Sequence, residues 1–230
     1  MVPLTHRQNG YAILSGSGLE IGALHEPAAV PAGVTVRYLD AVSAEQAAVL
    51  FPEIARERFV DVSFIGDLDN DGLGQFGDGA FDFVVANHVL EHVANPVKAI
   101  REVFRICRSG GTVIISIPDK DYTFDRGREL TSWGHLWSDY VNDVRRSSDD
   151  HYEGFLRSAA PHVFDEPPEN LKVHVQIARN RREHAHVWNS ETFEQFLQEC
   201  FARLGIAAEL RYKSAASENR IEYFSVWQRR

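Results

Sequence analysis

Cysteine is scarce in this chain, which has two cysteines in 230 residues. Cys107 and Cys200 lie far apart in the sequence, and each stands in an apolar stretch with helical spacing. This pattern is not that of a disulfide framework. We therefore expect two reduced cysteines in the core of a cytoplasmic protein.

Positive charge and long apolar runs are also scarce. The chain has 24 Lys and Arg against 33 Asp and Glu, a net charge of −9. Binding to a nucleic-acid backbone needs clustered basic residues, so the negative net charge argues against nucleic acid as the main partner. A local basic patch is still possible at Arg179, Arg181 and Arg182. No apolar run approaches the length of a membrane span. The first ten residues lack the basic-then-apolar order of a signal peptide, so we expect no membrane contact.

The chain also lacks repeats, and its first half alternates strand and helix signals instead. Its length and its 44% hydrophobic content fit one core with an elaborated cap. The alternation predicts an α/β fold with a doubly wound, mostly parallel sheet and right-handed crossovers. The expected strands are 18–22, 34–40, 59–65, 81–86 and 112–117, and the expected helices are 44–50, capped by Ser43 and stopped by Pro52, and 96–107.

The pattern changes after Pro118. Residues 119–189 are rich in aromatic, charged and histidine residues, and we interpret them as a partly helical cap inserted after the fifth strand. Regular structure is expected again from Ser190, with a capped helix over 191–204 and strands around 208–212 and 221–228. An antiparallel closing pair would complete a seven-stranded sheet. We thus expect one domain in three segments, 1–118, 119–189 and 190–230.

Polar residues follow the expected strands at the edge where open α/β sheets bind ligands. A dinucleotide site needs the motif G-x-G-x-x-G at the turn after the first strand. We expect this turn, from Glu20 to Pro27, to lead into a helix, but its only glycine is Gly22. This argues against a nicotinamide-dependent oxidoreductase. Asp40 ends the second strand, where it can accept hydrogen bonds from ribose hydroxyls. Ribose recognition without a phosphate cradle suits a nucleoside such as S-adenosylmethionine.

Four ordered segments resemble the class I S-adenosylmethionine-dependent methyltransferases that act on small molecules. They are 19–22 (LEIG), Asp40, 81–92 (FDFVVANHVLEH) and 105–111 (RICRSGG). Residues 117–126 are similar to a bacterial subgroup associated with genes for cell-surface polysaccharides or secondary metabolites. The resemblance implies a Rossmann-like methyltransferase fold that binds S-adenosyl-L-methionine and releases S-adenosyl-L-homocysteine.

The resemblance also implies which residues bind the cofactor. In chain order, the implied positions are Glu20 and Gly22 (methionine), Asp40 (ribose), Asp67 and Leu68 (adenine), and Asn87 and His88 (methyl sulfonium).

The first turn departs from the family pattern, which usually has two or three glycines there. This departure motivates a second hypothesis, in which the chain is a catalytically silent module that serves as a partner or scaffold.

Methyl transfer aligns an acceptor with the methyl group, and an oxygen or nitrogen acceptor can also need a base. Histidine suits that role near neutral pH. His92, one turn beyond His88, is the first candidate, although it could instead cap its helix or form a hydrogen bond with the cap segment. His88 and His135 come next, and Asp119 and His151 are further alternatives. The cap predicts a polar acceptor such as a sugar, nucleotide sugar or natural product. The candidates for contacting it are Asp119 and Lys120, which could instead stabilise the loop after the fifth strand, and Tyr122, Arg126 and Trp133, which could equally tether the cap to the sheet.

Other features leave alternatives open. His88-x-x-Glu91-His92 matches the H-x-x-E-H pattern of inverted zinc peptidases, so a zinc hydrolase is a remote alternative. The context of the motif argues against a zinc hydrolase, because the motif follows a strand directly and Pro96 interrupts the helix. Among the ten histidines, His162 with His174 and His184-x-His186 are ligand-like, so a divalent metal in the cap deserves a test, although no resident metal is predicted. The oligomeric state is open, with a homodimer as one alternative, and Trp188 could anchor the cap to the sheet or to a partner chain.

Overall fold

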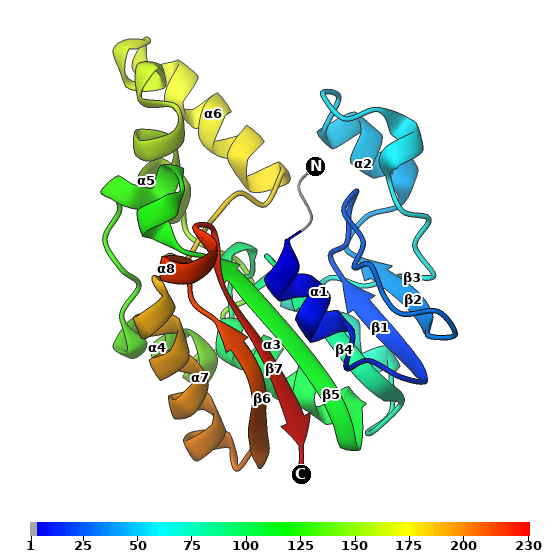
Figure 1. Cartoon of the computed structure of the whole chain (residues 1–230). Helices are drawn as coiled ribbons and strands as arrows, with labels where there is room; N and C mark the ends of the chain where they lie inside the picture. The colour runs from blue at the N-terminus through cyan, green and yellow to red at the C-terminus, as the bar shows by residue number, and fades with distance from the viewer. Residues whose placement is uncertain (1–3) are drawn as a thin grey trace.

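A seven-stranded sheet organises the protein, as a computed structural model that describes residues 4–230 shows (Figure 1). The strand order is β3-β2-β1-β4-β5-β7-β6, with β1 to β5 parallel and β7 antiparallel to both of its neighbours. The predicted fold class is confirmed. The strands are β1 (Ser17–Ile21), β2 (Thr35–Asp40), β3 (Phe64–Ile65), β4 (Phe81–Asn87), β5 (Cys107–Pro118), β6 (Ala208–Ser214) and β7 (Glu222–Arg229).

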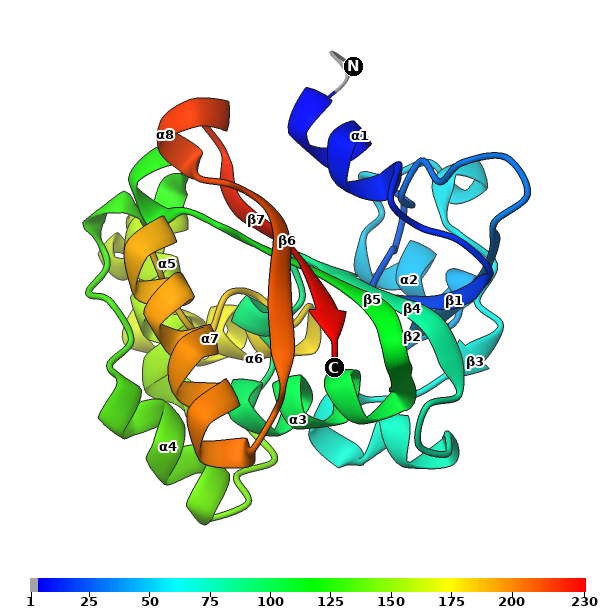
Figure 2. The ribbon, with the colours of Figure 1, turned by 60° about the horizontal axis from the view of Figure 1, so that its bottom comes forward.

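Helices cover both faces of the sheet (Figure 2). One face packs on α3, α4 and α7, and the other contacts α1 through β6 and β7. Among residues 4–230, no helix combines the length and the apolar character that a membrane crossing requires. The helices are α1 (Thr5–Tyr11), α2 (Ala44–Leu50), α3 (Pro96–Ile106), α4 (Trp133–Val141), α5 (Asp149–Ala159), α6 (Pro168–Asn180), α7 (Ser190–Leu204) and α8 (Ala216–Asn219).

The central crossover, from β4 through α3 to β5, follows from its local sequence. Asn95 caps α3 by accepting the N–H of Lys98, and Pro96 occupies the first turn, where its missing N–H costs nothing. Ile100 and Phe104 are fully buried on one side of α3, each contributing about 1.5–3 kcal/mol by leaving water. The chain therefore turns sharply after β4 and leaves the end of that strand open to a ligand.

Several predicted boundaries were wrong. The third strand is the pair Phe64–Ile65, because residues 59–63 are irregular. No helix follows β1: residues 22–34 form a loop, which the buried carboxylate of Glu20 holds by accepting the N–H of Ala28 at 3.0 Å. Strand β5 begins directly after α3, at Cys107, with a register shift against β4 before Thr112. The cap of α7 is Asn189 rather than Ser190.

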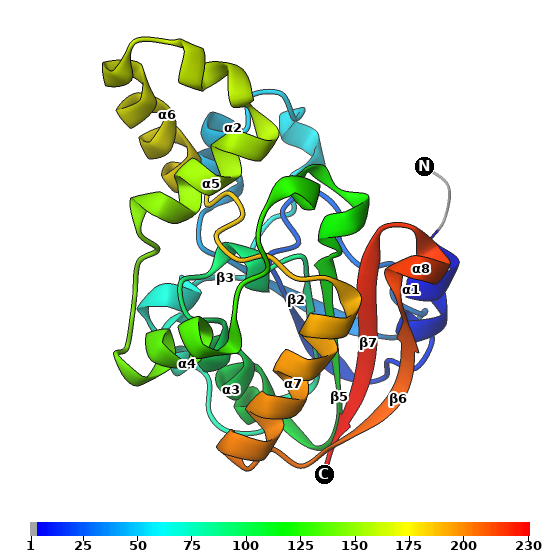
Figure 3. The same ribbon diagram turned by 90° about the vertical axis from the view of Figure 1, so that its left-hand side faces the viewer.

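The predicted cap is present between β5 and α7. Helices α5 and α6 pack against each other around their own apolar cluster, which includes Tyr152, Leu156 and Val175. Figures 1 and 3 show this pair beyond the carboxyl ends of the central strands, across from α2. The cap is therefore placed to cover the edge where open α/β sheets bind ligands. The functional division at residues 118 and 189 stays a prediction.

Candidate active site

A cavity of about 220 Å³ opens at the carboxyl ends of β1, β2 and β4. This is the place where the strand order reverses, since β2 and β4 lie on opposite sides of β1. The sheet contributes one wall and the cap segment 180–183 contributes another. The cavity therefore lies between the sheet and the cap.

Gly22, Asp40 and Leu68 all line this cavity, as the resemblance implies. Gly22 has a φ of +68°, and a Cβ there would lie 2.9 Å from Cγ2 of Val89, so this turn requires glycine. One carboxylate oxygen of Asp40 accepts the N–H of Ala41 at 2.7 Å. Burial raises the pKa of Asp40. Apolar side chains complete this wall, as an adenine ring would need.

Three of the other four positions implied for the cofactor do not line the cavity. Glu20 faces Ala28, and burial raises its pKa to about 7. Asp67 pairs with Arg182 at 2.5 Å. Asn87 donates to the hydroxyl of Tyr11 at 2.9 Å and accepts the hydroxyl of Ser116 at 3.1 Å. Glu20 thus holds the loop after β1, Asp67 holds the cap segment at Arg182, and Asn87 links β4 to α1 and β5.

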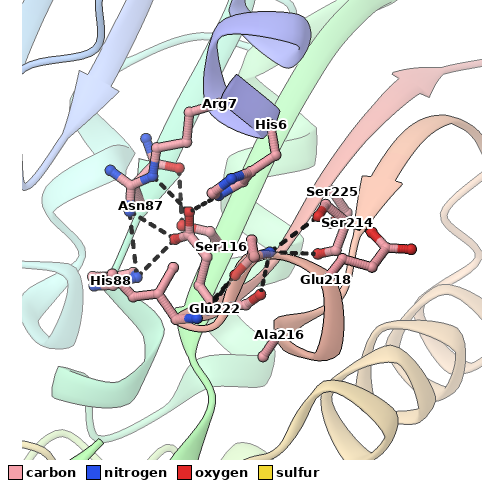
Figure 4. Close-up of polar contacts among 12 residues, drawn as sticks. His6, Arg7, Asn87, His88, Ser116, Ser214, Ala216, Glu218, Glu222 and Ser225 are labelled. Atoms are coloured by element: carbon pink, nitrogen blue, oxygen red, sulfur yellow. Dashed lines mark hydrogen bonds and ion pairs between the residues drawn. The ribbon is translucent and has the colours of Figure 1, made fainter. Parts of the chain in front are cut away.

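His88 lines the cavity and is held from behind by Glu222 (Figure 4). The fully buried carboxylate of Glu222 accepts hydrogen bonds from Nε2 of His88 at 2.8 Å, Nε2 of His6 at 2.6 Å, and Nε and Nη2 of Arg7 at 2.6 and 2.7 Å. Burial alone would raise the pKa of Glu222, but these hydrogen bonds outweigh it and hold that pKa well below its ordinary value. His88 thus has a fixed orientation, at a φ of +51°.

Sequence reasoning missed Glu222, Arg7 and His6. They belong to β7 and to α1, far in sequence from His88 and outside every motif considered. Glu222 follows the loop at the start of β7, where its neighbour across the sheet is Pro118 at the end of β5. A carboxylate in an otherwise apolar strand is a signal, but only the topology identifies its partners.

His92 also lines the cavity and belongs to a second polar cluster, with Glu91 and His184. Nδ1–H of His92 donates to the carbonyl of Arg182 at 2.5 Å, and Nδ1–H of His184 donates to Asp125 at 2.5 Å. Among residues 4–230, neither carboxylate oxygen of Glu91 has a hydrogen-bond partner, although this side chain is buried.

Burial raises the pKa of Glu91, so its ionised form needs a partner of opposite charge. One donor atom from each of Glu91, His92 and His184 lies within 4.8 Å of the others, so the cluster could hold a divalent cation. Protonated His184 could act instead, because Asp125 and Glu91 outweigh burial and raise the pKa of His184. Burial, with His184 beside it, lowers the pKa of His92 to about 3, which makes this ring a weak base.

The zinc-peptidase arrangement is not formed. Leu90–His92 is a single 3-10 turn rather than an α-helix, so His88 and His92 do not share a helix face. His88 binds Glu222, whereas His92 faces His184. In the cap, His174 pairs with Glu166 at 3.1 Å, and His184 and His186 belong to different clusters.

The candidates for acceptor contact lie outside the cavity. Asp119 accepts the backbone N–H and the hydroxyl of Ser190, both at 2.7 Å, and so ties the end of β5 to α7. The backbone N–H of Lys120 donates to the carbonyl of Trp188. Asp119 and the backbone of Lys120 thus stabilise the segment after β5, and their contact with an acceptor stays a prediction.

The remaining candidates are spread over the surface. Tyr122 lies under the guanidinium of Arg220, Arg126 is exposed, and Trp133 stacks on Trp137 against α7. Trp188 is 2% exposed and packs on aromatic side chains of α7, so it anchors the cap within the chain.

The cap supplies cavity residues that sequence reasoning did not assign to the cofactor. Asn180, Arg181, Arg182 and Glu183 line the cavity, and Arg182 reaches Asp67 on the sheet side. The basic cluster at 179–182 was the available signal. Its function was not apparent, because only the fold brings it back over the strand ends.

A doubly wound α/β fold with a glycine turn and a carboxylate at its switch point defines a nucleoside-binding class of enzyme fold. A family model described as a methyltransferase domain matches residues 3–200, so the chain belongs to that family. The resemblance to class I S-adenosylmethionine-dependent methyltransferases is confirmed.

Known proteins similar to this chain match it over limited stretches or at low identity. An uncharacterized protein of Methanocaldococcus jannaschii is 37% identical over 109 residues, 47% of this chain and 48% of that protein. Ajmaline N-methyltransferase of Rauvolfia serpentina is 48% identical over 40 residues, 17% of this chain and 14% of that enzyme. The chain thus spans about half or less of the curated relatives it matches.

A solved structure shows the same fold. It is a candidate Zn-dependent alcohol dehydrogenase of Rhodobacter sphaeroides, with a TM-score of 0.59 and 16% identity over 98% of this chain and 90% of that one. At this identity the likeness concerns the fold alone.

Proposed function

We propose that this protein transfers a methyl group from S-adenosylmethionine to an oxygen or nitrogen of a polar small molecule. The observation that carries the proposal is the convergence of Gly22 and Asp40 on one cavity at the switch point of a methyltransferase-family fold. In this proposal Asp40 accepts the ribose hydroxyls, Leu68 borders the adenine, and the turn at Gly22 accommodates the methionine end.

The cavity volume bears on how the cofactor would enter. About 220 Å³ is below the range of about 300–1,000 Å³ usual for ligand pockets. The cap segment 180–183 forms the wall opposite the sheet, so an outward shift of this segment would enlarge the site. When bound, S-adenosylmethionine supplies the electrophilic methyl group on its sulfonium.

His88 is the side chain best placed to take a proton from the acceptor. Its Nε2 lies 2.8 Å from the Glu222 carboxylate, so Nε2 carries the proton and Nδ1 keeps its lone pair. The side chain is 32% exposed and lines the cavity. A base in this position contributes about 10²–10⁴-fold to a rate. We therefore favour His88 over His92, whose lowered pKa makes it a weaker base.

The acceptor is proposed to be a sugar, nucleotide sugar or natural product. The net charge of −9 disfavours a nucleic-acid acceptor. A short match to an alkaloid N-methyltransferase is consistent with a small molecule. We also propose a cytoplasmic location, because both cysteines are free and buried.

The first test combines binding with turnover. Calorimetric titration with S-adenosylhomocysteine is expected to show binding in the wild type and in His88→Gln. A panel of sugar, nucleotide-sugar, phenol and amine acceptors with radiolabelled S-adenosylmethionine is expected to show turnover that falls at least about 100-fold in His88→Gln. Binding without turnover on every acceptor would favour the silent module instead. Absence of binding by the wild type would refute the proposed function.

A further inference from the structure

Three histidines of the cap converge at a place that the methyl-transfer proposal does not use. His135 comes from α4, His151 from α5, and His186 from the extended segment before α7 (Figure 3). One ring nitrogen of each lies within 4.8 Å of the other two. The ring centroids are 5.0 Å apart for His135 and His151, 5.1 Å for His151 and His186, and 5.6 Å for His135 and His186.

The ring of His186 is buried without the partners that a buried imidazole requires. It is 1% exposed, and among residues 4–230 neither of its nitrogens makes a hydrogen bond. The carbonyl of Ala94 is near enough to favour the protonated ring but is not in hydrogen-bonding geometry. Leaving a buried polar group unsatisfied costs about 1–3 kcal/mol, so this side chain points to a missing partner.

The other two rings are oriented as metal ligands usually are. Nδ1–H of His151 donates to the carbonyl of Ala185 at 2.8 Å, which fixes the ring and leaves Nε2 with a free lone pair. His135 lies 3.1 Å from the carboxylate of Asp139, one turn further along α4. Such outer contacts set the tautomer and orientation of histidine ligands.

The charged side chains around the cluster suit a bound cation. Asp139 provides a negative charge next to the cluster. The nearby cation, Arg128, is engaged by Asp125 and by the carbonyls of residues 151, 184 and 185.

We propose that His135, His151 and His186 form a binding site for a divalent transition metal ion, with zinc as the preferred occupant. Imidazole nitrogens suit zinc and other late first-row metals, whereas magnesium and calcium prefer oxygen ligands. With zinc–nitrogen bonds of about 2.0–2.1 Å, tetrahedral ligands lie about 3.3 Å apart. Because their donor nitrogens already lie within 4.8 Å of one another, the three rings need to approach by at most about 1.5 Å.

The site borders a second cavity, of about 610 Å³, which His135 and His151 line together with Ser132 and Arg157. Three protein ligands leave one position of a tetrahedral ion open, as in catalytic zinc sites. That position would be filled by water or by an oxygen or nitrogen ligand that enters the cavity. The site is independent of the cofactor cavity, which none of the three histidines lines.

The test is a competition titration of the full chain with Zn²⁺ against a chromophoric chelator. The wild type is expected to bind one ion at this site. His135→Ala and His151→Asn are expected to weaken binding at least about 10–100-fold, the loss typical even for outer-contact variants. His162→Ala, an exposed histidine of the same cap, is the matched control and is expected to bind as the wild type does. Replacing Zn²⁺ by Co²⁺ should give the visible bands of a tetrahedral nitrogen site in the wild type and in His162→Ala, and not in His135→Ala or His151→Asn.

Each other result overturns the proposal. Unaltered affinity in His135→Ala and His151→Asn would show that zinc binds elsewhere. Loss confined to His92→Gln would assign the ion to the cluster of Glu91, His92 and His184. No binding by the folded wild type, verified by circular dichroism, would leave His186 as a buried ring without a ligand role. None of these readouts depends on methyl transfer, so failure here and failure of the proposed function are distinguishable.

Discussion

Replacing Asp40 by asparagine gives the sharpest test of the cofactor cavity. The change keeps the shape of the side chain, removes its charge and replaces one acceptor oxygen by an NH2 donor. Hydrogen bonds to a charged group are worth about 1.5–3 kcal/mol and neutral ones about 0.5–1.5 kcal/mol. For two ribose hydroxyls the loss is about 2–3 kcal/mol, which corresponds to a fall in affinity of about 30–150-fold.

The expected loss is not caused by unfolding. Burial raises the pKa of Asp40, so its ionised form is disfavoured in the folded chain, and the variant should be at least as stable as the wild type. Ribose binding needs the carboxylate, so wild-type affinity should fall towards that of the variant as pH falls through this raised pKa. The pH dependence should be absent in Asp40→Asn.

Calorimetry with S-adenosylhomocysteine at several pH values measures both effects. Asp61→Asn, an exposed carboxylate before β3, is the matched control and should bind as the wild type does. Thermal unfolding of each variant without ligand verifies the fold. Equal affinity in Asp40→Asn and the wild type would refute the assignment of Asp40 to the ribose.

Three further changes test other parts of the structure. Glu222→Gln should cost about 3–5 kcal/mol of unfolding free energy near pH 7, because it leaves the largely buried guanidinium of Arg7 without its carboxylate partner. Because the pKa of Glu222 is lower in the folded than in the unfolded chain, this difference in unfolding free energy should shrink as pH falls below the ordinary glutamate pKa of 4.5. A difference between wild type and variant that stays constant with pH in urea titrations would contradict this. Gly22→Ala should weaken S-adenosylhomocysteine binding and destabilise the fold more than Gly33→Ala. Both glycines have a positive φ, but only at Gly22 would the added Cβ meet another side chain, that of Val89. Equal effects of the two changes would show that the contact with Val89 does not matter. Cys107, whose pKa burial raises to about 12, and Cys200 should resist iodoacetamide until the chain is unfolded, and rapid native labelling would show that they are accessible.

Local patterns were sufficient for the fold class. The fourth strand and the helix that follows it were predicted to within about one residue, because a fully buried parallel strand and an amphipathic helix each have a strong periodic signal. Strand β3 was overextended and the loop after β1 was expected to be helical. In both places tertiary contacts, such as that of Glu20 with Ala28, decide the conformation rather than propensity.

The sequence by itself determined the alternation of strands and helices, the family, and the presence of Gly22 and Asp40 at strand ends. These are properties of short segments, which periodicity and turn chemistry encode locally. Only the tertiary structure decided that Glu222 holds His88, and that three cap histidines meet. Such contacts join residues that lie far apart in the chain, and no local pattern records which distant side chain a buried charge or a buried imidazole will face.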